Sequence, residues 1–142
     1  MNRQDANREM QEMFGFVPGF MQNVPDEHIG ALWENFRKTQ LDEGVIPAKY
    51  QQLIMLAVST YAKCKYCTDF HTEVAKALGA SQKEITETAL LVGNTAMWSN
   101  FLGGTQYDFE KFKGEVRNAC RHMTSSSKDT QPPKGNGNRA RV

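Results

Sequence analysis

Cys64, Cys67 and His71 are the residues of this chain whose types and spacing suit chemistry. Positions three, four and seven apart share one face of an α-helix, so both thiols and the imidazole can face one cleft. A cysteine at the start of a helix lies near backbone N–H groups that stabilise a thiolate and lower the pKa of the thiol. An imidazole with an ordinary pKa of about 6.5 can take that proton or return it. The second thiol can then convert a sulfenic acid into a disulfide.

Three other interpretations of these residues stay open. In the first, the two thiols and the imidazole bind zinc with Cys120 or His122 as a fourth ligand, although no second C-x-x-C or paired histidine spacing supports it. In the second, they are a pair of buried cysteines and a core histidine. The third is a thioredoxin-like motif, which needs a strand before the cysteines. The sequence on both sides of the motif has a helical pattern instead.

The elements that position these residues are predicted to be helices, because apolar residues recur three and four positions apart and Gly or Pro separates the runs. Six helical segments and no strand are expected, which makes the fold class an all-α bundle. The segments are a short helix that ends at Gly15, one from an N-cap at Asp26 to Gly44, one with Pro47 in its first turn, one from Cys64 to Leu78, one over residues 82–102, and a last one that carries Phe109 and Met123.

Particular side chains define the faces and ends of these segments. In the second segment Ile29, Leu32, Trp33 and Phe36 share one face, and in the third Leu53, Ile54, Ala57, Val58 and Tyr61 form the most apolar stretch of the chain. We expect that third segment to be central. Gly79 supplies the stop after the cysteine helix, and Ser81 with Glu84 matches a capping box.

Length and composition predict one helical domain and exclude several function classes. With 142 residues, 39% of them hydrophobic, the chain has the size of a single domain, expected over residues 1–123 with its motif core at 47–102. Residues 124–142 are polar and rich in Gly and Pro, which predicts a disordered tail. The formal charge of +1 argues against nucleic-acid and membrane-surface partners. The sequence shows no signal peptide or membrane span, and we expect a cytoplasmic, reducing location.

A known family matches the stretch around the cysteines. The chain resembles the AhpD-like branch of the carboxymuconolactone decarboxylase family over roughly residues 47–91, on the run Tyr50–Val58, the motif Cys64-x-x-Cys67-x-x-x-His71, and Ala77-Leu78-Gly79-Ala80-Ser81 with Glu84, Ile85 and Glu87. The resemblance implies an all-α fold, homotrimers or homohexamers, and reduction of a hydroperoxide by thiols without a cofactor or metal. It further implies that Cys67 attacks the peroxide, that Cys64 forms the disulfide and that His71 relays protons.

One residue departs from the pattern of that family. A glutamate usually stands twelve residues before the first cysteine, and this chain has Gln52 there. An amide cannot accept and return a proton as a carboxylate does, although it can hold a water or orient the imidazole. We therefore expect peroxidase turnover to be weakened or redirected. Decarboxylation of a lactone lacks an evident acid or base in this sequence.

The sequence thus predicts a thiol-dependent hydroperoxide reductase that is recycled by a thiol or dithiol reductant. The alternative is a non-enzymatic, oligomeric binding module in which the same disulfide switches a contact with a partner. Oligomers are also expected from the size of the chain, because a single small bundle is too small to bury two apolar clusters. These are Met13, Phe14, Phe16, Phe20 and Met21 near the start, and Met97, Trp98, Phe101 and Leu102 in the fifth segment.

Overall fold

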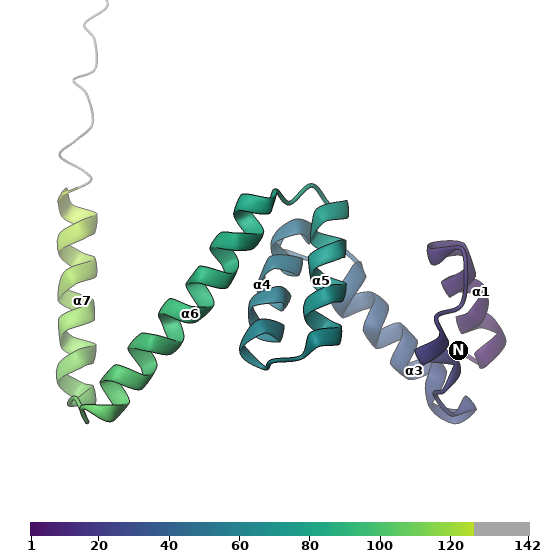
Figure 1. Cartoon of the computed structure of the whole chain (residues 1–142), viewed down its shortest axis with the longest axis horizontal. Helices are drawn as coiled ribbons and strands as arrows, with labels where there is room; N and C mark the ends of the chain where they lie inside the picture. Colours follow the sequence, from purple (N-terminus) through teal and green to yellow (C-terminus); the bar gives the residue numbers. More distant parts are fainter. Residues whose placement is uncertain (127–142) are drawn as a thin grey trace, which may run out of the picture. The chain divides into compact units, whose positions relative to one another are not determined.

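The computed structural model describes residues 1–126, and within that range it contains helices and no strand (Figure 1). The elements are α1 (Arg3–Phe14), α2 (Gly19–Gln22), α3 (Asp26–Phe36), the π-helical turn η1 (Arg37–Leu41), α4 (Ala48–Tyr61), α5 (Lys65–Ala77), α6 (Gln82–Gly104) and α7 (Phe109–Ser126). The predicted all-α class is confirmed. The chain forms two compact units, residues 1–95 and a second that begins at Ala96.

The apolar core of the first unit lies between α1, α2 and α3. Its buried members are Ala6, Met10, Met21, Ile29 and Trp33. Gly15 ends α1 in the left-handed conformation (φ 80°), as its position in the sequence predicts. The short helix α2 lies where the Gly and Pro residues predict only a connection, and it places Met21 in this core.

Helix α3 is shorter than the sequence pattern predicts. Pro25 is its N-cap and Asp26 its first helical residue, so the predicted cap is wrong by one position. The helix ends at Phe36 and the chain continues as η1 to Leu41, instead of running on to Gly44. Leu32, expected on the buried face, is 51% exposed.

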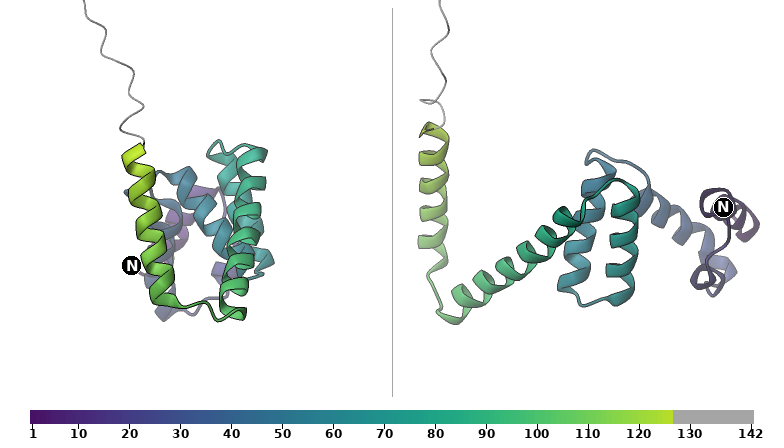
Figure 2. Two further views of the ribbon diagram at one scale, coloured as in Figure 1. Left: turned by 90° about the vertical axis from the view of Figure 1, so that its left-hand side faces the viewer. Right: turned by 45° about the horizontal axis from the view of Figure 1, so that its top comes forward.

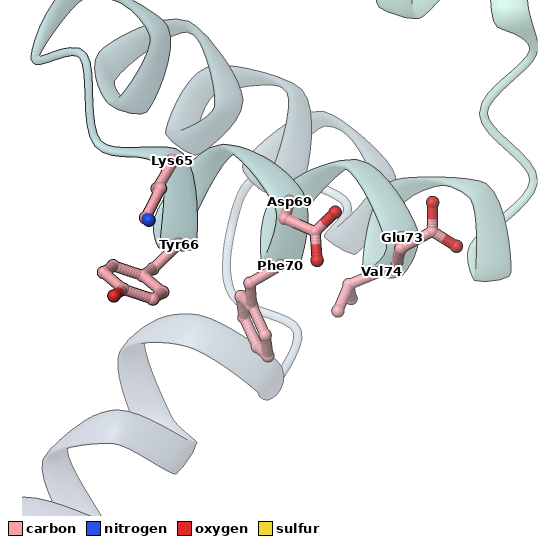
Figure 3. Close-up of a pocket in the computed structure, with 6 residues that line it drawn as sticks. All are labelled: Lys65, Tyr66, Asp69, Phe70, Glu73 and Val74. Atoms are coloured by element: carbon pink, nitrogen blue, oxygen red, sulfur yellow. The ribbon is translucent and has the colours of Figure 1, made fainter. Parts of the chain in front are cut away.

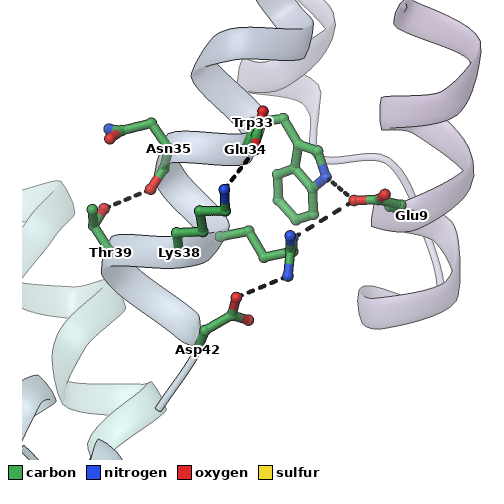
Figure 4. A network of polar contacts seen from close by, with 8 residues as sticks. Glu9, Trp33, Glu34, Asn35, Lys38, Thr39 and Asp42 are labelled. Atoms are coloured by element: carbon green, nitrogen blue, oxygen red, sulfur yellow. Dashed lines mark hydrogen bonds and ion pairs between the residues drawn. The ribbon is translucent and has the colours of Figure 1, made fainter. Parts of the chain in front are cut away.

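A polar network surrounds the junction between α3 and η1 (Figure 4). Trp33 donates its indole N–H to Glu9 Oε2 at 2.8 Å, which ties α3 to α1. Arg37 pairs with Asp42 across η1 at 2.8 Å, and its Nε lies 3.7 Å from the Glu9 carboxylate. These contacts hold the turn through which α3 leads into α4.

Helices α4 and α5 lie side by side as a hairpin (Figure 1, Figure 2). The buried residues of α4 are Gln52, Leu56 and Ser59, which follow one another at helical spacing. The apolar residues that led us to expect this helix to be central do not form its buried face: Ile54, Val58 and Tyr61 are at least half exposed, and Leu53 and Ala57 are intermediate. Pro47 is the N-cap of α4 and precedes its first turn.

The joint between α5 and α6 follows the prediction closely. Gly79 has a positive φ of 85°, which glycine adopts without strain, and α5 ends just before it. Ser81 Oγ accepts the Glu84 N–H at 3.2 Å and Glu84 Oε2 accepts the Ser81 N–H at 2.7 Å, so the capping box is confirmed. Glu84 also pairs with Lys49 at the start of α4, at 2.8 Å.

The second unit contains the end of α6 and all of α7. Gly103 and Gly104 are the last residues of α6, which therefore runs past the predicted end at residue 102. In this unit Tyr107 donates to the Glu115 carboxylate at 2.8 Å. Helix α7 runs to Ser126, past the predicted boundary at residue 123, and the rest of the predicted tail, 127–142, lies outside the described residues. Within residues 1–126 no helix is long and apolar enough to cross a membrane.

Candidate thiol redox site

The turn before α5 places the two candidate thiols at the start of the helix. Lys63 has a positive φ of 55°, a strained conformation for a residue with a side chain, and Cys64 follows it as the N-cap. The Cys64 N–H bonds to the Ser59 carbonyl at 3.1 Å. Cys64 Sγ accepts the backbone N–H of Cys67 at 3.3 Å, so a sulfur takes the place that a serine or aspartate oxygen fills in most N-caps.

The two thiols have different acidities. The pKa of the Cys64 thiol is lowered, mainly by a hydrogen bond with the Cys67 side chain. Hydrogen bonds from the backbone N–H groups of Cys67 and Tyr66 lower it further. The hydrogen bond to Cys64, with burial and the charge of Cys64, raises the pKa of the Cys67 thiol. The sequence predicts a lowered pKa for both thiols, and that prediction is wrong for Cys67. Cys64 is therefore the thiol that ionises first.

His71 lies one turn after Cys67 and faces the interior of the hairpin. It is buried, and burial lowers the pKa of its imidazole because the charged ring loses hydration. Its Nδ1 is 2.8 Å from Gln52 Oε1 on α4. The structure thus brings together His71 and Gln52, two of the residues that the sequence singles out.

Gln52 is held from its other end as well. Its side chain is 1% exposed, and its Nε2 donates to the main-chain carbonyl of Gln40 in η1 at 2.5 Å. The sequence points to Gln52 but not to Gln40. Gln40 takes part through its backbone carbonyl, which every residue has, so its residue type gives no indication of this role. The sequence also does not point to Ser59, whose hydroxyl donates to the Met55 carbonyl at 2.7 Å and which stands seven residues after Gln52 on the buried face.

A family model matches residues 27–106, which is more than half of the chain and includes every residue of the candidate site. The chain belongs to the carboxymuconolactone decarboxylase family. Its fold matches the crystal structure of an alkylhydroperoxidase AhpD core from Rhodospirillum rubrum, with a TM-score of 0.67 and 24% sequence identity. The match covers 77% of this chain and 84% of that one. A comparison with curated proteins finds no match.

Within this family fold, the zinc interpretation finds no ligand group in the described part of the chain. Among residues 1–126 no three His, Cys, Asp or Glu side chains are grouped so that they could hold a metal ion. Cys67 and His71 lie on α5 and Cys64 is its N-cap, yet the three do not form such a group. Cys120 and His122, the possible fourth ligands, lie on α7 and are exposed.

An open groove runs along α5, on a face that carries neither cysteine nor His71 (Figure 3). It has a volume of about 570 Å³ and is lined by Lys65, Tyr66, Asp69, Phe70, Glu73 and Val74. Phe70 also packs against Phe36 of α3, with ring centroids 5.7 Å apart. Neither thiol nor the imidazole lines this groove, so it is separate from the three candidate groups.

Proposed function

We propose that this chain reduces hydroperoxides through a reversible disulfide between Cys64 and Cys67. The observation that carries the proposal is the capped start of α5, where Cys64 Sγ accepts the N–H of Cys67. The capping contact places the two cysteines in one turn and stabilises one of them as a thiolate. Membership of the carboxymuconolactone decarboxylase family and the AhpD-like fold support the same chemistry.

The first step is attack by Cys67, the thiol nearer to the imidazole in the sequence of α5. His71 takes the Cys67 proton, and the sulfur attacks the terminal oxygen of the hydroperoxide. An S–O bond forms as the O–O bond breaks. The alkoxide takes the proton back from the imidazolium, so the products are an alcohol and a Cys67 sulfenic acid.

The second step uses the more acidic thiol. The Cys64 thiolate attacks the Cys67 sulfur, an S–S bond forms, and the hydroxide that leaves takes up one proton to become water. The lowered pKa of Cys64 suits this role, because a more acidic thiol supplies the attacking thiolate more readily. Hydrogen bonding from Cys67 is the main cause of that lowered pKa.

Return to the dithiol requires two electrons from a thiol or dithiol reductant. Cys67 is exposed and Cys64 is partly buried, so the incoming thiolate reaches Cys67 more readily. Attack there breaks the S–S bond and releases Cys64, the better leaving group because of its lowered pKa. A second thiol then displaces the mixed disulfide from Cys67, and the reductant leaves as its disulfide.

A thiol count tests the disulfide. One equivalent of hydroperoxide should remove two of the three titratable thiols, with Cys120 still free and no crosslink between chains. Cys120→Ser is the matched control and should lose both remaining thiols. Persistence of all three thiols would overturn the proposal, and stoichiometric zinc in the purified protein would favour the metal interpretation.

Single cysteine variants test the roles of the two thiols. Cys67→Ser should abolish peroxide consumption, and Cys64→Ser should accumulate a sulfenic acid on Cys67 that a dione reagent traps. A sulfenic acid on Cys64 in the Cys67→Ser variant would reverse the assignment.

The neutral amide of Gln52 supports a second candidate, the redox-responsive binding module. An amide with both ends hydrogen-bonded cannot pass a proton on, and a module needs only one oxidation for each signal. Excess dithiol separates the two candidates. An enzyme then consumes many peroxides per chain, much faster than the dithiol does alone. A module, whose disulfide the dithiol also reduces, adds little to that background rate and instead changes its partner affinity on oxidation.

We further propose that the chain works as a homotrimer or homohexamer. Of the 23 residues of α6, Thr88 is the one that the described structure buries, while Leu90 and Leu91 are 68% and 59% exposed. Neighbouring helical residues point about 100° apart, so apolar surface covers more than one side of this helix. Second copies of the chain would cover it, together with Met97, Trp98 and Phe101.

Light scattering tests the assembly. A mass of about three or six times the 16.0 kDa of the chain supports the proposal, and a mass near 16.0 kDa defeats it. Leu90→Glu should shift the mass toward the single chain. Lys83→Glu places the same side chain on an already polar position of α6 and should leave the mass unchanged.

A further inference from the structure

The carbonyl of Gln40 is presented by an irregular turn. Gln40 lies near the end of η1, where the Asp42 N–H bonds back to the Arg37 carbonyl at 2.9 Å and the chain then becomes extended (φ −70°, ψ 140°). The last carbonyls of a helix have no donor within the helix. Gln40 receives its donor from the side chain of Gln52, at 2.5 Å.

This contact determines which end of the Gln52 amide faces the imidazole. A carbonyl oxygen only accepts hydrogen bonds, so the group that faces Gln40 is the NH₂ of the amide. The Oε1 atom is then the group that lies 2.8 Å from His71 Nδ1. A reversed amide would set two oxygens against each other, and with Gln52 only 1% exposed, solvent would not compensate for that.

The ring of His71 must therefore carry a hydrogen on Nδ1, because Oε1 has none to donate. We infer that Gln40 and Gln52 together hold His71 as its Nδ1–H tautomer, so that Nε2 is the nitrogen that takes and returns protons. Gln40 and Gln52 are positioning residues in this scheme, since they act through the imidazole. The tautomer itself does not depend on the proposed function; only the transfer of protons by Nε2 does.

The same geometry explains why an amide suits position 52 of this chain. An ionised carboxylate has no hydrogen to donate, so it would place a charged oxygen against the Gln40 carbonyl. The Arg37–Asp42 pair holds the turn from which that carbonyl projects. Position 52 therefore accepts an amide or a protonated acid. Gln52 thus acts together with the Gln40 carbonyl to orient His71. Position 52 has a role in this chain even though its amide relays no proton.

Nitrogen-15 NMR of the imidazole rings reads the tautomer directly. The measurement uses the full-length, reduced protein without peroxide, at a pH where the rings are neutral. His71 should show a protonated Nδ1 and an unprotonated Nε2. The exposed His28 and His122 provide internal references and should show the mixture typical of free imidazole. A protonated Nε2 on neutral His71 would overturn the inference.

Two glutamine variants provide the matched comparison. Gln52→Met removes the acceptor at nearly constant volume and should return His71 toward the free-imidazole mixture. Gln51→Met makes the same change one position earlier on α4, at a side chain whose Oε1 has no hydrogen-bond partner among residues 1–126, and should leave the tautomer as in the wild type. Retention of the Nδ1–H form in a folded Gln52→Met variant would contradict the inference.

Gln52→Glu provides a test that keeps the shape of the side chain. The introduced carboxyl should have a pKa well above the ordinary value of about 4.3, because only its protonated form can donate to Gln40. An ordinary or lowered pKa there would contradict the inference. These measurements use no peroxide, so they can confirm the His71 tautomer even if the protein has no peroxidase activity. The tautomer and the proposed peroxide reduction are therefore tested independently.

Discussion

The interior between α1, α2 and α3 is apolar, whereas the interior of the α4–α5 hairpin is largely polar. The first buries Met10, Ile29 and Trp33 completely. Beside Leu56 and Ala75, the second buries Gln52, Ser59 and His71. It packs Gln52 and His71 against each other. Both interiors belong to the first unit of the chain and are connected through η1.

This difference indicates that the two regions have different roles, one in stability and the other in orienting polar groups. Removal of apolar surface from water stabilises a fold without any requirement for direction. A buried polar group costs free energy unless it is hydrogen-bonded, and the hairpin meets that condition with Gln52 on the Gln40 carbonyl and Ser59 on the Met55 carbonyl. The α1–α3 region therefore stabilises the unit, while the hairpin orients the His71 imidazole, which can carry a proton.

The largest stability effect should come from Trp33→Ala. The substitution leaves a large cavity in the apolar interior and removes the indole N–H that Glu9 accepts, at a cost of about 3–5 kcal/mol in unfolding free energy. Urea unfolding measures the loss. Leu32→Ala, at the adjacent and half-exposed position, should cost far less. Equal losses at the two positions would contradict the assignment of the core to this face of α3.

The second effect is on the hairpin. Gln52→Leu keeps the volume but leaves the Gln40 carbonyl and the His71 Nδ1–H without partners, so unfolding free energy should fall by about 1–3 kcal/mol. Gln51→Leu is the control, because that side-chain oxygen has no hydrogen-bond partner to lose in the described part of the chain. If Gln52→Leu matches or exceeds the stability of the wild type, the polar interior is not held together by its hydrogen bonds.

Sequence patterns predict those parts of the fold that depend on local signals. Gly15, Gly79 and the Ser81–Glu84 box each end or begin a helix through contacts within a few residues, and all three predictions are confirmed. The all-α class follows from the same periodicity. The end of α3 is missed because a π-helical turn inserts a change of register that no residue type signals.

The residues of the candidate site can be proposed from the sequence, but their surroundings cannot. The spacing of Cys64, Cys67 and His71 follows from helical geometry, and the family resemblance points to Gln52. The burial of α4 could not be predicted correctly, because its apolar residues are more numerous than its buried face can hold. The different acidities of the two thiols arise first from the hydrogen bond between the Cys64 and Cys67 side chains, and for Cys64 also from the Cys67 N–H that it accepts as N-cap, contacts that residue types do not signal.

A smaller effect is expected outside both interiors, at the cap of α6. Ser81→Ala removes the acceptor of the Glu84 N–H and should cost about 1 kcal/mol of unfolding free energy, which thermal or urea unfolding detects. Ser99→Ala makes the same change at an exposed position within α6 and should cost nothing measurable. A loss as large as that of Trp33→Ala would mean that the cap, and not the apolar core, limits the stability of the first unit.

The smallest effect is a dependence of stability on pH that only the polar interior produces. Burial holds the pKa of His71 below its value in the unfolded chain, about 6.5, so the unfolded state binds more protons between the two values. Unfolding free energy should therefore fall as the pH decreases through about 6.5 toward the folded pKa, and should be independent of His71 above that range. His71→Gln should remove this slope in urea titrations at a series of pH values. His28→Gln, an exposed change on α3, should keep it because His71 is still present. An unchanged slope in the His71→Gln variant would show that another group, outside the hairpin, gives the fold its response to acid.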